Sequence, residues 1–168
     1  DASTSVDTLA LNEAHGTGTA LGDPIEAGSL VGGVLSAREE ALAVGGVKAN
    51  IGHAEPAAGM TGLLKLAVRL RCADAAPNAQ LRALNPHVGG ALGGVTCMLS
   101  MELALITANL SVLESIIGGV SSFGYSGTIA NAVLAFGSGG ECGALASGST
   151  DKSDKVLDFG SRGAQAAG

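Results

Sequence analysis

Three nitrogen-bearing side chains stand where they could act together on one carbonyl group. His15 precedes a turn of alternating glycine and threonine (HGTGT), and His53 closes the segment KANIGH, which begins at Lys48. Two neutral imidazoles that share a site can donate N–H bonds to one developing oxyanion. A lysine ammonium beside them favours negative charge on that oxygen and discourages protonation of the imidazoles. The three residues therefore indicate chemistry at a thioester or ketone carbonyl.

The elements around His15 are predicted to be a strand and a helix. The apolar run from Val6 to Leu11 predicts a buried strand that leads into the histidine. A helix is expected to start at Asp-Pro-Ile-Glu, with Asp23 as the N-cap and Glu26 completing a capping box. We expect this helix to run to about Ala37.

The second histidine is expected in the same kind of setting. Ala43 to Val47 predicts a strand, and Lys48 to His53 a loop. A helix is predicted to follow, with Lys65 and Arg69 outside its apolar face. That face consists of Met60, Leu63, Leu64, Ala67 and Leu70. Strand–loop–helix repeats of this kind predict an α/β fold with helices covering a sheet. In such folds ligands bind at the strand ends, where both histidine loops are expected.

The rest of the chain divides into a strand pair and a polar tail. Gly119 to Ser122 and Thr128 to Phe136 predict two strands around the tight turn FGYSG. Beyond this the sequence turns to Gly, Ser, Asp, Lys and Ala, which is typical of a disordered linker. We therefore expect one folded unit over residues 1–136 and a Gly/Ser-rich tail over residues 137–168.

Composition excludes several classes of partner. The net charge of −6 argues against nucleic acid, since phosphate binding needs a basic patch. No apolar run reaches the ~18 residues that span a membrane. The first residues (DASTSVD) resemble no signal peptide, and the missing initiator Met suggests a piece of a longer chain. We expect a cytoplasmic location, or an organellar one if a targeting segment lies upstream.

Other uses of the histidines remain open at this point. Either His15 or His53 alone could be a core histidine with satisfied nitrogens, and His87 is expected to be structural. A zinc site would need further ligands in a pattern such as HExxH, which is absent, so we expect no metal. The turn GTGTALGD is not GxxxxGK[ST], and Asp23 at the helix start would repel phosphate.

Three motifs together resemble the β-ketoacyl synthase family, and most closely the ketosynthase domain of modular type I polyketide synthases. They are EAHGTGTALGDPIE, VKANIGHAEPAAGMTGLLK and GVSSFGYSGT, in that order. The resemblance implies a thiolase-like layered fold with a mixed sheet, of which this chain would be the incomplete C-terminal half. It also implies an acyltransferase that performs a decarboxylative Claisen condensation between an acyl thioester and a malonyl unit, in polyketide or fatty acid biosynthesis.

The resemblance also implies partners and residue roles. His15 and His53 would polarise the malonyl thioester, and Lys48 would support them electrostatically. Thr17 and Thr19 would bind the pantetheine arm, and the backbone N–H of Tyr125 would hold the oxyanion while its ring gates the pocket. No cofactor is bound directly, because phosphopantetheine arrives on an acyl carrier protein. The remainder of the ketosynthase domain is a further partner, and the intact enzyme is expected to be a homodimer.

The departures from the family bear on activity. The nucleophilic cysteine of the family lies before the first histidine, and we expect none of Cys72, Cys97 and Cys142 to replace it. Asn131 stands where the family usually has a histidine, and residues 98–117 depart from the expected sequence. Two hypotheses follow: a ketosynthase section that works only with its missing part, or a non-catalytic chain that binds carrier protein or a sister subunit. In either case an uncovered face predicts self-association of the isolated chain.

Overall fold

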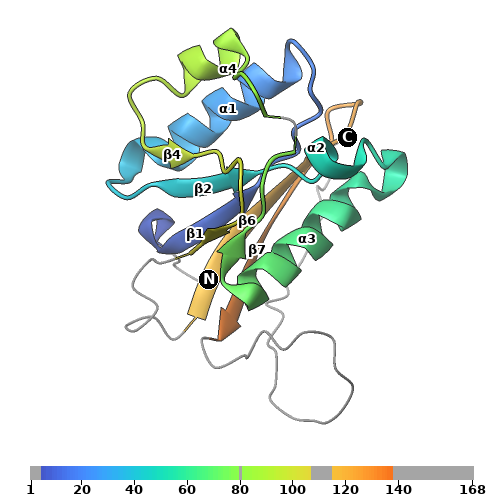
Figure 1. Cartoon of the computed structure of the whole chain (residues 1–168). Helices are drawn as coiled ribbons and strands as arrows, with labels where there is room; N and C mark the ends of the chain where they lie inside the picture. Colours follow the sequence, from blue (N-terminus) through green and yellow to red (C-terminus); the bar gives the residue numbers. More distant parts are fainter. Residues whose placement is uncertain (1–4, 80, 107–114, 138–168) are drawn as a thin grey trace, which may run out of the picture.

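A computed structural model describes residues 5–79, 81–106 and 115–137 of the chain (Figure 1). Its main sheet has five strands in the order β4-β2-β1-β6-β7. A separate antiparallel pair joins β3 to β5. The strands of both sheets are β1 Leu9–Glu13, β2 Leu42–Gly45, β3 Asp74–Ala75, β4 Cys97–Met98, β5 Ala104–Leu105, β6 Ser115–Phe123 and β7 Ile129–Gly137.

The main sheet is mixed, and its parallel part contains the strands that lead to the histidine loops. β1 pairs in parallel with β2 on one side and with β6 on the other, and β4 extends the parallel part beyond β2. Only the last strand, β7, runs antiparallel to its neighbour β6. The predicted α/β class with a mixed sheet is therefore confirmed.

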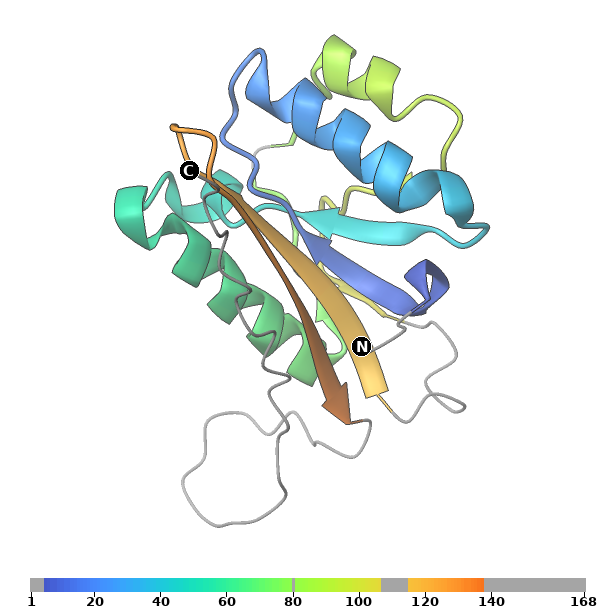
Figure 2. The same cartoon turned by 180° about the vertical axis from the view of Figure 1, so that it is seen from behind.

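Helices lie on both faces of the main sheet. α3 packs across β6, β1 and β7 on one face, while α1 and α4 contact each other on the opposite face, over β2 (Figures 1 and 2). In Figure 2 no described helix crosses the near side of β6 and β7. The α-helices are α1 Gly22–Gly33, α2 Lys48–Ile51, α3 Ala58–Cys72 and α4 Pro86–Ala91, with short 3-10 helices at Val6–Thr8, Leu35–Ala37 and Glu55–Ala57.

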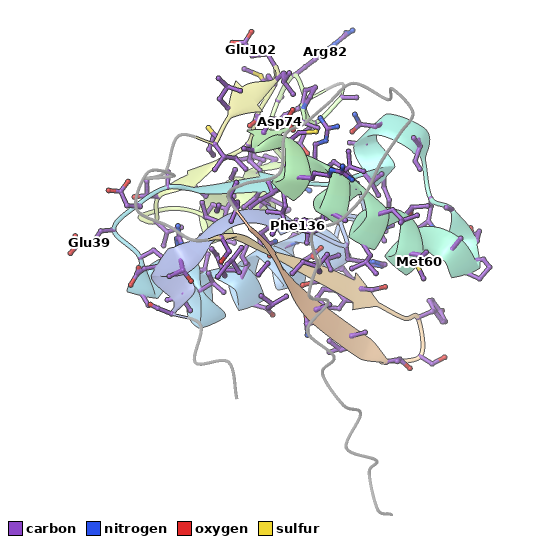
Figure 3. The ribbon with its side chains drawn as sticks, turned by 90° about the horizontal axis from the view of Figure 1, so that it is seen from below. Glu39, Met60, Asp74, Arg82, Glu102 and Phe136 are labelled. Atoms are coloured by element: carbon purple, nitrogen blue, oxygen red, sulfur yellow. The ribbon has the colours of Figure 1, made fainter. Side chains whose placement is uncertain are left out.

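The core lies between α3 and the sheet. Leu66 and Leu70 of α3 are fully buried against Leu11 of β1 and Val120 of β6. Phe136 of β7 packs against this cluster from the sheet, beneath α3 (Figure 3). Aliphatic side chains fill the space almost alone, as expected from a chain with only 2% aromatic residues.

Several predicted boundaries are wrong by a few residues. Val6–Thr8 forms a 3-10 helix, and the first strand begins only at Leu9. α1 ends at Gly33, before the predicted Ala37, because a 3-10 turn takes over at Leu35. The predicted loop after β2 contains the short helix α2.

The predicted apolar face of α3 is also partly wrong. Met60 and Leu64 are each 58% exposed, and Met60 projects from the helix in Figure 3. Lys65, which the pattern placed outside that face, turns toward the sheet and pairs with Glu13. The face that packs on the sheet contains Ala58, Gly62, Leu66 and Leu70.

The strand pair around FGYSG is confirmed. β6, Ser115–Phe123, is longer than predicted, and β7, Ile129–Gly137, has the predicted length but lies one residue further along the chain. The predicted tail lies outside the described residues, apart from Gly137. Part of the unexpected stretch, residues 107–114, lies outside them too. No helix of the described part combines the length and the apolar character that crossing a membrane requires.

Gly118 marks the closest approach of α3 to the sheet, and it generates a prediction for stability. A Cβ at Gly118 would lie 2.8 Å from Leu66 Cδ1 and 3.0 Å from the Leu11 carbonyl oxygen. We expect Gly118→Ala to lower the free energy of unfolding by about 1–3 kcal/mol through overpacking. Denaturant unfolding of the chain at low micromolar concentration measures this change.

Gly28 in α1 provides the matched control, because a Cβ there meets nothing within 4 Å. Gly28→Ala should stabilise the chain by about 0.5–1 kcal/mol, since glycine is a poor helix former. Equal effects of the two substitutions would contradict the packing described for α3.

Candidate active site

The parallel strands bring the two predicted loops to one edge of the sheet. His15 follows the end of β1 at Glu13, and Lys48 follows the end of β2 at Gly45. Because β1 and β2 are parallel neighbours, their carboxyl ends meet at the same edge. There Lys48 Nζ lies 3.4 Å from His15 Nδ1 and also donates a hydrogen bond to the carbonyl oxygen of His15.

His53 reaches the same edge from the far end of α2. Gly52, with a φ of +79°, turns the chain after this helix in a conformation that favours glycine. The His53 ring then lies 6.0 Å from the His15 ring, with the two planes at 90°. The Phe123 ring, from the end of β6, is 5.5 Å from the His15 ring. The structure thus brings His15, His53 and Lys48 together, while their catalytic roles stay a prediction.

Hydrogen bonds to the imidazoles select a tautomer for each ring. The backbone N–H of Glu55 donates to His53 Nδ1 over 2.9 Å, so the proton of the neutral His53 ring resides on Nε2. Lys48 presents its ammonium donor to His15 Nδ1, which likewise leaves the proton on Nε2. Both rings therefore offer an Nε2–H donor.

Burial and the neighbouring Lys48 ammonium favour an uncharged His15. The residue is only 9% exposed, and burial lowers the pKa of its imidazole, with Lys48 and His53 lowering it further. Asp23 acts in the opposite direction. A neutral ring near pH 7 is the state required for an N–H donor that does not itself carry charge.

Glu26 holds the loop that carries His15. Its carboxylate accepts the backbone N–H groups of His15 and Gly16 over 2.6 and 2.8 Å. Burial raises the pKa of Glu26, and these two hydrogen bonds oppose the rise. The predicted capping box is therefore wrong. Glu26 reaches back to the histidine loop, and α1 begins at Gly22 without a side-chain cap.

Asp23 and the two threonines organise the glycine-threonine turn. Asp23 Oδ1 accepts the Gly18 N–H over 3.0 Å and lies 3.4 Å from the Thr17 hydroxyl. The Thr19 hydroxyl accepts the Gly22 N–H over 3.1 Å and lies 3.1 Å from the Thr17 hydroxyl. Thr17 lines the adjoining cavity, whereas Thr19 does not.

A cavity of about 480 Å³ opens beside these residues. Lys48, His53 and Thr17 form part of its polar wall, next to Asp23 and Glu26. The apolar wall includes Leu30, Val44, Leu81, Leu84, Val88, Leu92 and Leu99. Its size suits a small extended ligand, since ligand pockets usually measure ~300–1,000 Å³.

Other candidate residues lie away from this group. Tyr125 occupies the β6–β7 turn with its side chain fully exposed, and it does not line the cavity beside the histidines. His87 lies in the exposed first turn of α4, where its backbone N–H donates to the Asn85 side chain over 2.9 Å. Asn131 Oδ1 lies 2.8 Å from the Ser121 hydroxyl, which donates to it. The proposed role of Tyr125 stays a prediction.

Cys97, the last described cysteine along the chain, lacks the character of a nucleophile. It lies in β4, partly buried, and burial raises the pKa of its thiol. A raised pKa reduces the fraction of thiolate, which is the reactive form. Among the described residues, no three His, Cys, Asp or Glu side chains are grouped as metal ligands would be.

The buried carboxylate of Glu13 is a residue of the site that was not predicted from the sequence. Glu13 is 1% exposed, and its Oε2 lies 2.6 Å from Lys65 Nζ. A signal for this pair existed, because a glutamate ends the apolar run LALNE and a lysine stands inside the apolar helix GLLKL. A charged residue at such a position is buried only with a partner.

The sequence and the fold match those of ketosynthases. Residues 1–82 match the family model described as the β-ketoacyl synthase C-terminal domain. The chain is similar to the erythronolide synthase EryA2 of Saccharopolyspora erythraea, with 39% identity over 122 residues, which are 73% of this chain and 3% of that protein. It is also similar to the polyketide synthase GfsA of Streptomyces halstedii, with 38% identity over 73% of this chain and 2% of that protein.

A solved structure agrees with these relatives. The ketosynthase from module 6 of the bacillaene synthase of Bacillus subtilis 168 superposes with a TM-score of 0.68 and 32% identity, over 76% of this chain and 23% of that one. The chain belongs to the β-ketoacyl synthase family and corresponds to the C-terminal part of a ketosynthase of the polyketide synthase type. It spans less than a quarter of the length of the solved ketosynthase and a few per cent of the curated relatives.

The low pKa of His15 can be tested through Lys48. Because the Lys48 ammonium disfavours a second positive charge, Lys48→Met should raise the pKa of His15. The pH dependence of hydrogen–deuterium exchange at the imidazole Cε1, read by mass spectrometry, measures this pKa. Arg71→Met, at the exposed end of α3, removes a cation without changing the site and serves as control. An unchanged His15 pKa in Lys48→Met would contradict the electrostatic role of Lys48.

Proposed function

We propose that this site belongs to an acyltransferase that performs the decarboxylative Claisen condensation of polyketide, or fatty acid, biosynthesis. The observation that supports this most directly is the convergence of His15, His53 and Lys48, in which Nδ1 of each ring faces an N–H donor. The names of the relatives agree with a condensing role, since they are polyketide synthases and ketosynthases.

The proposed reaction uses the imidazoles on the malonyl unit. The bond between the malonyl carboxylate and its α-carbon breaks, carbon dioxide leaves, and the electron pair forms an enolate. The Nε2–H groups of His15 and His53 stabilise the enolate oxygen, and the Lys48 ammonium adds a favourable field. The enolate carbon then attacks the acyl thioester, and a thiolate departs as the new carbon–carbon bond forms.

The substrate would enter on the phosphopantetheine arm of an acyl carrier protein. Thr17, at the cavity wall, is the proposed donor to this arm, and Thr19 supports Thr17 through their hydroxyl contact. For Tyr125 we keep only the backbone N–H as a proposed oxyanion donor, because its ring is fully exposed. No cofactor is proposed to bind directly to the chain.

The acyl thioester needs a cysteine from elsewhere. We propose that the remainder of a ketosynthase domain supplies it and that the intact enzyme is a homodimer. Support comes from the outer side of α3, where Met60, Leu64 and Val68 are 49–58% exposed at helical spacing. Support also comes from the side of β6 and β7 that faces away from α3, where a second cavity of about 380 Å³ opens.

A non-catalytic role is the second candidate. The same apolar stripe on α3 would serve a chain that only binds a sister subunit or a carrier protein. Activity separates the two candidates, because only the first depends on the imidazoles.

The catalytic proposal predicts the effect of removing each imidazole. The transcript is first extended upstream to find a cysteine segment in frame, and the extended protein is assayed for release of carbon dioxide from malonyl carrier protein. His15→Ala and His53→Ala should each lower the rate about 100- to 1,000-fold, the usual cost of losing an oxyanion donor. His87→Ala, which removes an exposed histidine on α4, should leave the rate unchanged. Equal rates in all three variants would falsify the proposed function.

The proposed interface predicts self-association of the isolated chain. Exposed apolar area favours association by ~25 cal/mol per Å² buried. Leu64→Lys should therefore shift the chain toward the monomer in sedimentation velocity experiments. Leu103→Lys is the matched control, because Leu103 is 59% exposed but lies outside α3. A compact wild-type monomer at all concentrations would contradict this proposal.

A further inference from the structure

Glu13 is a carboxylate buried at the junction of the three elements that surround the site. It ends β1, two residues before His15, and is only 1% exposed. Its Oε2 accepts a hydrogen bond from Lys65 Nζ of α3 over 2.6 Å. Its Oε1 accepts the backbone N–H of Val47, the residue directly before Lys48. Both oxygens therefore have a partner, as a buried charge requires.

The surroundings of this carboxylate leave little room for movement. A Cβ on Gly45 would come within 3.0 Å of Lys65 Nζ, so the β2 backbone lies directly against the ion pair. On the other side of the corner, Asn78 Oδ1 accepts the Gly46 N–H over 2.9 Å. Glu13 and Asn78 thus hold two successive backbone N–H groups between β2 and α2.

We propose that Glu13 is a positioning residue for the reaction, which sets the Lys48 ammonium against His15 through the Val47 N–H and through its own charge. The proposal deepens the proposed function and rests on it for the identity of the reaction. Lys65 has the supporting role of binding Oε2 of Glu13, which leaves Oε1 turned toward Val47.

The charges that face Lys48 support this assignment. Burial lowers the pKa of Lys48, and three carboxylates oppose the effect, Glu13 first, followed by Glu26 and Asp23 from α1. His15 lies against the Lys48 ammonium, and His53 lies against His15 with Glu55 beside it. Without Glu13 the Lys48 ammonium would therefore lose its proton at a lower pH.

A purely structural ion pair is the alternative, and α3 contains a matched example. Arg69 Nη1 lies 3.0 Å from Asp74 Oδ1, with side chains that are 24% and 11% exposed. This pair joins the other end of α3 to β3, away from Lys48. Asp74→Asn therefore removes a carboxylate from an ion pair of the same helix without touching the site.

The test measures the proton affinity of Lys48 in the whole chain. Acetylation of Lys48 by trace acetic anhydride is followed against pH, and the Lys48 peptide is quantified by mass spectrometry. Glu13→Gln, which keeps a side-chain acceptor for Val47, should lower the pKa of Lys48. Asp74→Asn should leave it unchanged. Glu13→Gln leaves the Lys65 ammonium without its charged partner. The double variant Glu13→Gln/Lys65→Met removes that ammonium and should be more stable than Glu13→Gln alone. Lys48 of the double variant should still titrate below its wild-type value.

Two results would overturn the proposal. One is an unchanged Lys48 titration in Glu13→Gln, and the other is an equal change in Asp74→Asn. In the extended protein, Glu13→Gln should lower kcat by about 10- to 100-fold with little change in KM, as expected from a misplaced catalytic group. The Lys48 titration needs no turnover, so it decides the role of Glu13 even if the histidine variants refute the proposed reaction.

Discussion

The parallel pairing of β1 with both of its neighbours is the constraint on which the site depends. Leu11 lies opposite Ala43 of β2 and Gly118 of β6, so the three strands end at one edge. His15 and Lys48 follow β1 and β2, and Phe123 is the last residue of β6, so His15 contacts both of the others at this edge. An antiparallel neighbour would deliver its loop to the opposite edge.

Buried carboxylates complete what the strand pairing begins. Glu26 holds the backbone on the histidine side, and Glu13 holds the backbone on the lysine side. Each acts on main-chain N–H groups, which are fixed by the fold and do not rotate as side chains do. The loops that carry His15 and Lys48 are therefore held in place by carboxylates that accept hydrogen bonds from their backbone.

The sequence predicted the site better than the framework that holds it. Periodicity and turn residues located β6, β7 and α3, and the shared strand-to-helix setting correctly suggested that His15 and His53 meet. The helical pattern failed for Lys65, because a charged residue was taken as solvent-facing and its partner lies in a distant strand. Glu26 was assigned to a local cap for the same reason, since long-range hydrogen bonds leave no periodic signal.

Because Glu13 binds a main-chain N–H group, the hydrogen bond restricts which residues can replace Val47. Position 47 contributes an amide hydrogen to Glu13, and its side chain only has to fill a small buried space. Its φ of −60° is one that a pyrrolidine ring adopts, yet proline there would delete that hydrogen while fitting the backbone angle. Other aliphatic residues can thus replace Val47, whereas proline at this position would remove the hydrogen bond that links Glu13 of β1 to the residue before Lys48.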